Sequence, residues 1–97
     1  MERLPPVHPG DILQRDFLDE LGLSAYRLAQ QTGMPAQRIS EIVNGKRSIT
    51  ADTALRLGRF FDVDPQWWLN MQAHYDLEVT RRALGDRLDT EVRPLVS

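Results

Sequence analysis

The sequence predicts an all-α protein of five helices. No strand-like alternation of polar and apolar residues of useful length occurs before residue 90. Apolar residues recur instead with helical spacing, and Ser, Thr, Asp, Pro and Gly stand where helices begin and end. A chain of 97 residues has the size of one domain with its own core, so residues 1–97 are predicted to form a single domain.

The first helix is predicted at about residues 10–21. It follows Pro9, because proline suits the first helical turn, and Gly22 ends it. His8, directly before Pro9, is interpreted as a helix-entry residue. One apolar face of this helix comprises Ile12, Leu13, Phe17 and Leu18.

The second and third helices are predicted at about residues 25–32 and 35–43. Ser24 is a suitable N-cap for the second, and Gly33 ends it. Pro35 opens the third, whose termination is indicated by the sequence Asn44-Gly45. The inward side chains of the third helix are predicted to be Ile39, Ile42 and Val43.

The fourth and fifth helices are predicted at about residues 51–61 and 65–84. Thr50 caps the fourth, and the Asp64-Pro65 pair opens the fifth, which is the longest. Residues 86–97 form a tail for which the sequence leaves a short strand over "TEVRPLV" and a frayed end open. The inner face of the fourth helix is predicted to comprise Ala51, Ala54, Leu55 and Gly58.

The fifth helix has more apolar surface than packing on one side requires. One stripe, suited to the core, comprises Trp68, Met71, Tyr75 and Val79. A second stripe comprises Leu69, Ala73, Leu77 and Leu84. The second stripe predicts a dimer interface with an identical chain, whereas a domain that buries both stripes internally is the alternative.

The second and third helices have the spacing of a helix-turn-helix. Two short helices joined by a tight glycine turn cross steeply, so a small residue is needed where they meet. Ala29 supplies that residue, Gly33 the turn, and Ile39 the inward anchor, while Leu28 and Ile42 complete the wedge.

If the third helix enters the major groove, its outward N-terminal positions face the bases. Gln can bond adenine, Arg can bond guanine, and Glu can accept from cytosine N4. The alternative is an ordinary polar helix face in water, and Glu41 could instead merely orient Arg38. The candidate base-facing residues are Gln37, Arg38, Ser40 and Glu41.

Polar and basic residues that flank this helix suit contacts to phosphates, which position a protein on DNA without specifying sequence. Three follow the third helix and three begin the second. These backbone-contact candidates are Ser24, Tyr26, Arg27, Asn44, Lys46 and Arg47.

The charge distribution agrees with this placement although the net charge is −2. Residues 24–59 contain six Lys or Arg and only two Asp or Glu, whereas acidic residues outnumber basic ones in residues 1–23 and 60–97. Basic residues are therefore concentrated around the predicted recognition helix.

Other classes of function find less support in the sequence. There is no cysteine, no apolar run as long as a membrane span and no apolar N-terminal stretch, so a cytoplasmic protein is predicted. His8 and His74 are the only histidines, and they lie in separate segments without metal-ligand spacing. We therefore predict no catalytic residue, no metal and no cofactor.

Two stretches, "HPGDIL" and "LGLSAYRLAQQTGMPAQRISEIVNGKRSITADTALRLGRFFDVDPQWWLNMQAHYDL", together resemble the HigA-type antitoxins. These belong to the Xre-like helix-turn-helix group of bacterial toxin–antitoxin systems and are related to the lambda-repressor-like fold. The resemblance covers about residues 7–84, and its specificity comes from "HPG", "GKRSITADTAL" and "WWLNMQAHYDL" occurring together in order.

The resemblance implies a protein that binds the promoter of its own operon and represses it. It also implies neutralisation of a co-encoded HigB toxin, similar to the RelE-type ribosome-dependent mRNA endonucleases, and dimerisation through the C-terminal region. By match to the family's motif, the base-facing and loop positions are those named above.

Two alternatives remain open at the level of sequence. A stand-alone Xre-type repressor without a toxin partner needs the same DNA-contacting helices. A module that binds an acidic protein through its basic region would lack the steep salt dependence expected of phosphate contacts.

Overall fold

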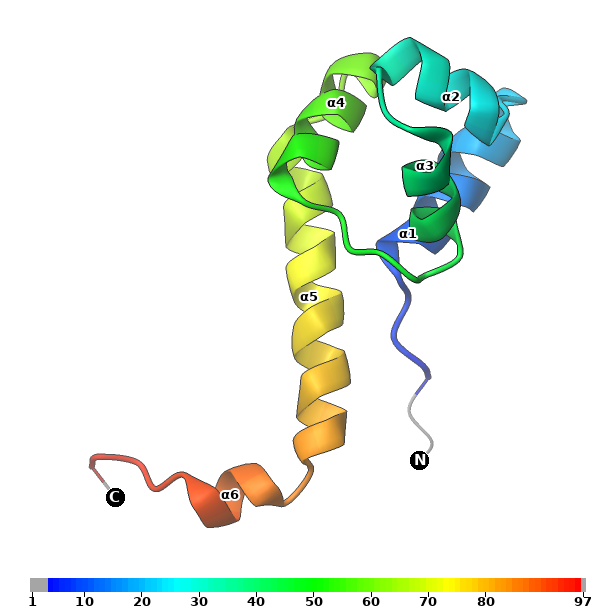
Figure 1. Cartoon of the computed structure of the whole chain (residues 1–97). Coiled ribbons are helices and arrows are strands. Elements are labelled where there is room, and N and C mark those ends of the chain that lie inside the picture. Colours follow the sequence, from blue (N-terminus) through cyan, green and yellow to red (C-terminus); the bar gives the residue numbers. More distant parts are fainter. Residues whose placement is uncertain (1–3, 97) are drawn as a thin grey trace.

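The computed structural model describes residues 4–96, and its helices are α1 (Pro9–Ile12), η1 (Leu13–Asp19), α2 (Ala25–Thr32), α3 (Ala36–Val43), α4 (Ala51–Phe61), α5 (Pro65–Leu84) and α6 (Arg87–Glu91). Figure 1 shows the first four α-helices gathered at one end, with α5 extending away from them and α6 turning aside from its far end. No strand occurs within the described residues, which confirms the all-α prediction.

Local chemistry sets most helix ends where the sequence indicated. The Oγ of Ser24 accepts from the backbone N–H of Arg27 at 3.0 Å, and the Oδ1 of Asp64 accepts from that of Gln66 at 2.9 Å. His8 is the N-cap of α1, because its Nδ1 accepts from the N–H of Gly10 at 2.8 Å. The helix-entry role predicted for His8 is therefore confirmed.

The first helical segment differs from an ordinary α-helix. After one α-helical turn it continues as the π-helix η1. A π-helix has hydrogen bonds between residues five apart, so side chains at that spacing lie near the same face of the helix. Leu13 and Leu18 have this spacing, and both are fully buried.

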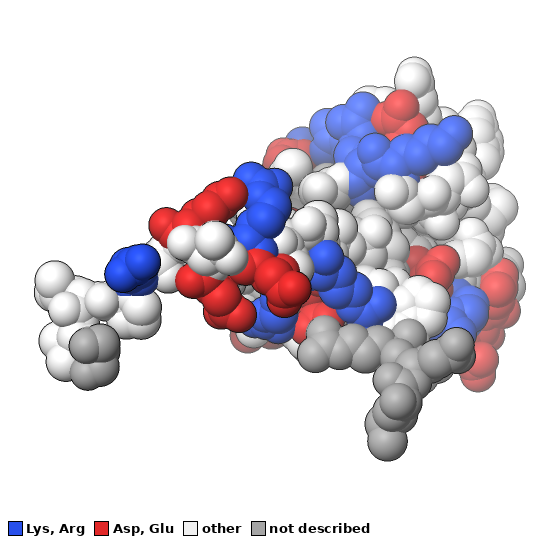
Figure 2. All heavy atoms as spheres, turned by 90° about the horizontal axis from the view of Figure 1, so that it is seen from below, with Lys and Arg blue, Asp and Glu red and all other residues white. Residues whose placement is uncertain are grey.

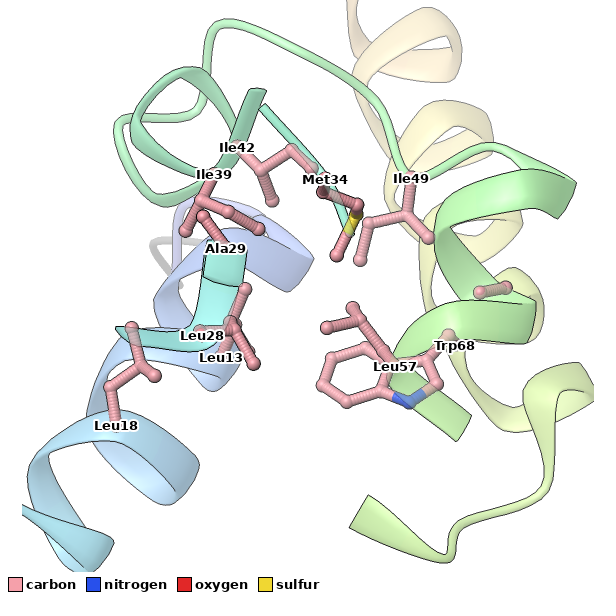
Figure 3. Close-up of a cluster of buried hydrophobic side chains, with 11 residues drawn as sticks. Leu13, Leu18, Leu28, Ala29, Met34, Ile39, Ile42, Ile49, Leu57 and Trp68 are labelled. Carbon is pink, nitrogen blue, oxygen red and sulfur yellow. The ribbon is translucent and has the colours of Figure 1, made fainter. Parts of the chain in front are cut away.

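The core lies among α1–α4 and η1, which together form the helical cluster, and Trp68 at the start of α5 completes it. Figure 3 shows Trp68 and Leu57 facing Leu13 and Leu28 across it. The side chain of Trp68 is 0% exposed, so α5 is attached to the cluster by its first turns. The core residues are Leu13, Leu18, Leu28, Ala29, Met34, Ile39, Ile42, Ile49, Ala54, Leu57 and Trp68.

The predicted inner face of α4 is wrong at two positions. Ala51 and Leu55 are exposed, whereas Thr53 and Leu57 are buried beside Ala54 and Gly58. The buried face is thus rotated from the predicted one, because Ala54 and Leu57 are the α4 side chains that enter the common core.

The tail also differs from expectation. Residues 87–91 form α6 and residues 92–96 continue without a strand partner, so the short-strand alternative is wrong. A strand needs an edge to pair with, and the described chain offers only helices.

No helix in the described range has the length and apolar character that a membrane crossing requires.

Candidate nucleic-acid interface

The α2–turn–α3 unit is built as the motif requires. Gly33 adopts a left-handed conformation with φ +71°, which favours glycine, and its N–H caps α2 at the carbonyl of Ala29. Ala29 is 5% exposed where the helices meet, and Ile39 is fully buried. The small-residue, turn and anchor positions predicted for a helix-turn-helix thus have those roles.

The outer face of α3 presents a short polar surface. Ala36, Gln37 and Ser40 are exposed, while Arg38 and Glu41 are half-buried. The amide Nε2 of Gln37 donates to the Oε2 of Glu41 at 3.4 Å, a long contact that competing partners can replace. Gln37 and Ser40 are therefore available for contact from outside the protein.

Arg38 is turned toward α4. Its Nη1 donates to the Oδ2 of Asp52 at 2.6 Å, and its side chain is 27% exposed. Asp52 also accepts from the Nε of Arg56 at 3.0 Å. The hydrogen bond from Arg38 is the largest cause that lowers the pKa of Asp52, with Arg56 next.

Glu41 pairs with the loop that follows α3. Its Oε1 accepts from the Nε of Arg47 at 2.8 Å, and this bond is the main cause that lowers the pKa of Glu41. The hypothesis that Glu41 orients Arg38 is wrong, because Arg38 is paired with Asp52 instead.

The loop after α3 is ordered by its own hydrogen bonds. The Nδ2 of Asn44 donates to the carbonyl of Ser40 at 2.9 Å, which ties the end of the helix. The backbone N–H of Lys46 bonds the carbonyl of Glu41 at 2.8 Å, and its side chain is exposed. The side chain of Lys46 therefore projects from a fixed turn beside α3, whereas that of Arg47 is bonded to Glu41 and remains 48% exposed.

The start of α2 offers a further exposed surface. The side chain of Tyr26 is 66% exposed, and its hydroxyl accepts from the Nε2 of Gln30 at 3.2 Å. Arg27 is exposed, and Ser24 is occupied as the N-cap. Tyr26 and Arg27 can therefore meet an external group without breaking an internal ion pair.

The four dimer candidates on α5 are unequal. Leu69 is partly buried and packs against the core, and Leu84 is half-buried. Ala73 is exposed, and Leu77 is 61% exposed. Of the four candidates, Ala73 and Leu77 are therefore the uncovered ones, and α5 also exposes the apolar side chains of Trp67 and Val79.

Charged side chains near the other end of the molecule are mixed in sign. Figure 2 shows acidic and basic side chains intermixed around the end of α5 and α6. Arg81 bonds Glu78 at 2.8 Å and Arg87 bonds Glu91 at 3.1 Å, so much of this charge is paired locally. Acidic residues also outnumber basic ones in residues 60–97, so this end is less suited to a row of phosphates than the α3 region.

The histidines do not converge. His8 is buried against Tyr75, with ring centroids 4.8 Å apart, and His74 is exposed on α5. Within residues 4–96 no group of three or more His, Asp or Glu side chains is placed to hold a metal ion.

Two structurally important residues were not identified from the sequence. Gln72 is buried, and its Oε1 accepts from the N–H of Ile49 at 2.8 Å, which fixes the loop before α4 to α5. Asp52 joins two arginines. Its spacing of four from Arg56 was a usable signal, but its pairing with Arg38 required the fold.

Comparison with known proteins places the chain among DNA-binding regulators. The helix-turn-helix family pattern matches residues 14–68. Virulence-associated protein I of Dichelobacter nodosus is 51% identical over 81% of this chain and 73% of that protein. Antitoxin HigA-1 of Vibrio cholerae is 34% identical over 78% of this chain and 71% of that protein. The structure of Pseudomonas aeruginosa antitoxin HigA with the higBA promoter has a TM-score of 0.90 at 41% identity, covering 94% of this chain and 99% of that chain.

Proposed function

The chain belongs to the helix-turn-helix family, and from its likeness to HigA antitoxins we propose that it is an antitoxin and transcriptional autorepressor. In this proposal it binds palindromic operator DNA through α2 and α3 and neutralises a co-encoded, HigB-like (RelE-type) mRNA-cleaving toxin in the cytoplasm. The observation that supports it most directly is the likeness to an antitoxin structure solved with its promoter, over 94% of this chain. It needs no catalytic residue, cofactor or metal.

The DNA interface centres on the exposed face of α3. We assign base contacts first to Gln37 and Ser40, because neither is held in an ion pair. Glu41 can accept from cytosine only if it shares or releases Arg47. Arg38 belongs to the same face, but it is paired with Asp52.

Backbone contacts would come from both sides of that face. Lys46 and Arg47 lie in the loop after α3, and Tyr26 and Arg27 lie at the start of α2. Ser24 and Asn44 already bond the protein backbone, so we expect them to fix the two segments that approach the phosphates.

A dimer follows from the energy that specificity requires. Two good base contacts supply about 2–6 kcal/mol of discrimination, at about 1–3 kcal/mol each. Specific binding typically exceeds non-specific binding by about 4–10 kcal/mol, so one half-site reaches only the lower part of this range, whereas two half-sites can span it. We place the dimer contact on the uncovered apolar surface of α5, around Ala73 and Leu77.

The dimer is tested by sedimentation of the full chain. Leu77→Glu puts a charge on the proposed interface and is expected to give monomers, while Leu4→Glu alters an exposed leucine outside α5 as the control. A Leu77→Glu chain that sediments like the wild type, or a wild type that is monomeric on palindromic DNA, would contradict this interface.

The DNA-contact assignment is tested by the preference of the protein for selected duplexes over scrambled ones. Gln37→Ala is expected to lower the preference by about 5-fold or more per half-site, the equivalent of roughly 1–3 kcal/mol, with little change in non-specific binding. Gln66→Ala, the same exchange on the exposed first turn of α5, is the matched control. An unchanged preference in Gln37→Ala would refute base contact by Gln37.

The toxin partner is tested by co-expression with the product of the neighbouring gene. Copurification and rescue of growth support the antitoxin function. A chain that represses its own promoter but neither binds nor rescues would support the alternative, a stand-alone Xre-type repressor.

A further inference from the structure

Asp52 connects three helices of the helix-turn-helix region through one carboxylate oxygen. Its Oδ2 accepts from the Nη1 of Arg38 on α3 at 2.6 Å and from the Nε of Arg56 on α4 at 3.0 Å. The Nη1 of Arg56 in turn donates to the carbonyl of Thr32, the last residue of α2, at 2.9 Å. The chain of bonds therefore runs from the end of α2 through α4 to the recognition helix.

The glycine turn is part of the same arrangement. A Cβ built at Gly33 would lie 3.0 Å from the Nη1 of Arg56, tighter than an ordinary contact. Gly33 thus leaves room for the guanidinium group in addition to adopting a positive φ. The guanidinium occupies the C-terminal end of α2, where a cation also satisfies the unpaired carbonyl and the helix dipole.

The Arg38–Asp52 ion pair can restrict the rotation of α3 about its own axis, which apolar packing alone does not fix. α3 packs mainly against α1 and α2, whereas α4 packs mainly against α2 and α5. Ile39 and Ile42 bury α3 in the shared core, but apolar burial is non-directional. A charge-assisted hydrogen bond has a defined geometry, so the Arg38–Asp52 pair can fix the rotation of α3 relative to α4.

We propose that Asp52 is a specificity-determining positioning residue, which holds Arg38 so that Gln37 and Ser40 face the bases. This inference rests on the proposed DNA-binding function. Through its bond to Arg38, Asp52 on α4 sets the orientation of α3, the proposed recognition helix. If Arg38 instead bonded guanine, Asp52, which is 54% exposed, would keep Arg56 as its one remaining partner. Its less compensated negative charge beside the DNA phosphates would then oppose binding.

The experiment compares full-length variants on duplexes that the wild-type protein selects from a random library. Affinities for selected and scrambled duplexes are measured for Asp52→Asn, Arg38→Ala and the double variant. Asp89→Asn makes the same charge change on α6 and is the control. Thermal melting of each variant separates loss of orientation from loss of folding, and Arg38→Ala provides the same test if Asp52→Asn fails to fold.

We expect Asp52→Asn and Arg38→Ala to lose at least about 5-fold in preference per half-site, the size of one base contact of about 1 kcal/mol. The loss should be spread over several base pairs, and the double variant should be no worse than the worse single one, because both break the same link. Wild-type preference in Asp52→Asn would overturn the proposal. Tighter binding by Asp52→Asn together with relaxed preference at one base pair in Arg38→Ala would also overturn it, because that outcome assigns Arg38 to a base. A wild-type chain that selects no sequence would instead refute the proposed DNA-binding function itself.

Discussion

Replacing Gly10 by alanine should destabilise the protein, although helix propensity alone predicts the reverse. Gly10 lies in the first turn of α1, and alanine is about 1 kcal/mol more favourable than glycine inside a helix. In the folded protein, a Cβ at this position would lie 2.7 Å from the carbonyl carbon of Ile42 and closer still to its oxygen. The close approach of α1 to the end of α3 therefore requires glycine.

The size of the effect follows from what has to move. Non-bonded carbon atoms prefer about 3.5–4.0 Å, so the backbones of α1 and α3 must separate by about 1 Å or more. Overpacking in a core costs about 1–3 kcal/mol, and we expect at least about 3 kcal/mol because the obstacle is backbone rather than a flexible side chain. For a domain of this size, that loss corresponds to a fall in melting temperature of about 12 °C or more.

Thermal and urea unfolding followed by circular dichroism measure this change, at one protein concentration because a dimer makes melting concentration-dependent. Gly22→Ala is the control, because Gly22 has φ +61° and nothing within 4 Å of its Cβ position. It should lose only the conformational cost of about 1–2 kcal/mol for a left-handed residue. A Gly10→Ala chain that melts at or above the wild-type temperature would refute the close-approach argument.

Two further predictions concern buried polar groups. Burial lowers the pKa of His8, opposed by Asp11 and Asp76, so the folded chain binds fewer protons than the unfolded chain, and stability should fall as pH drops below about 6.5. His8→Asn, which keeps a capping side chain, should lose this part of the pH dependence in urea titrations, and equal slopes in both proteins would contradict the assignment. Gln72→Ala should cost about 1–3 kcal/mol, because the buried N–H of Ile49 loses its partner. Asn70→Ala on the exposed face is its control, and equal melting of the two variants would show that the bond contributes nothing.

The ends of the helices could be predicted because they depend on neighbours in sequence. Ser24, Thr50 and Asp64 each accept from a backbone N–H two or three residues ahead, and Gly33 is left-handed as a helix-ending glycine should be. Such capping hydrogen bonds form within one helical turn and do not depend on tertiary packing. The buried face of α4 depended instead on which side met the other helices, and there the prediction failed at Ala51 and Leu55.

The same division holds at the candidate interface. The polar, outward positions of Gln37 and Ser40 follow from helical spacing around the buried Ile39, so the sequence indicated them. The sequence suggested Arg38 as the partner of Glu41, and this was wrong. The observed partner is Arg47, which approaches Glu41 because the turn at Gly45 brings the chain back toward α3.

The sequence by itself determined the five predicted helical segments, the turn and the polar face of this protein, since these arise from spacing and from residues a few positions apart. It did not indicate α6 or the π-helical form of η1. Tertiary structure alone decided which charges meet. Arg38 and Asp52 are 14 residues apart, and their 2.6 Å contact exists only because α4 packs beside the helix-turn-helix. Tertiary structure also makes glycine necessary at position 10, because a Cβ there would clash with the backbone carbonyl of Ile42 on α3.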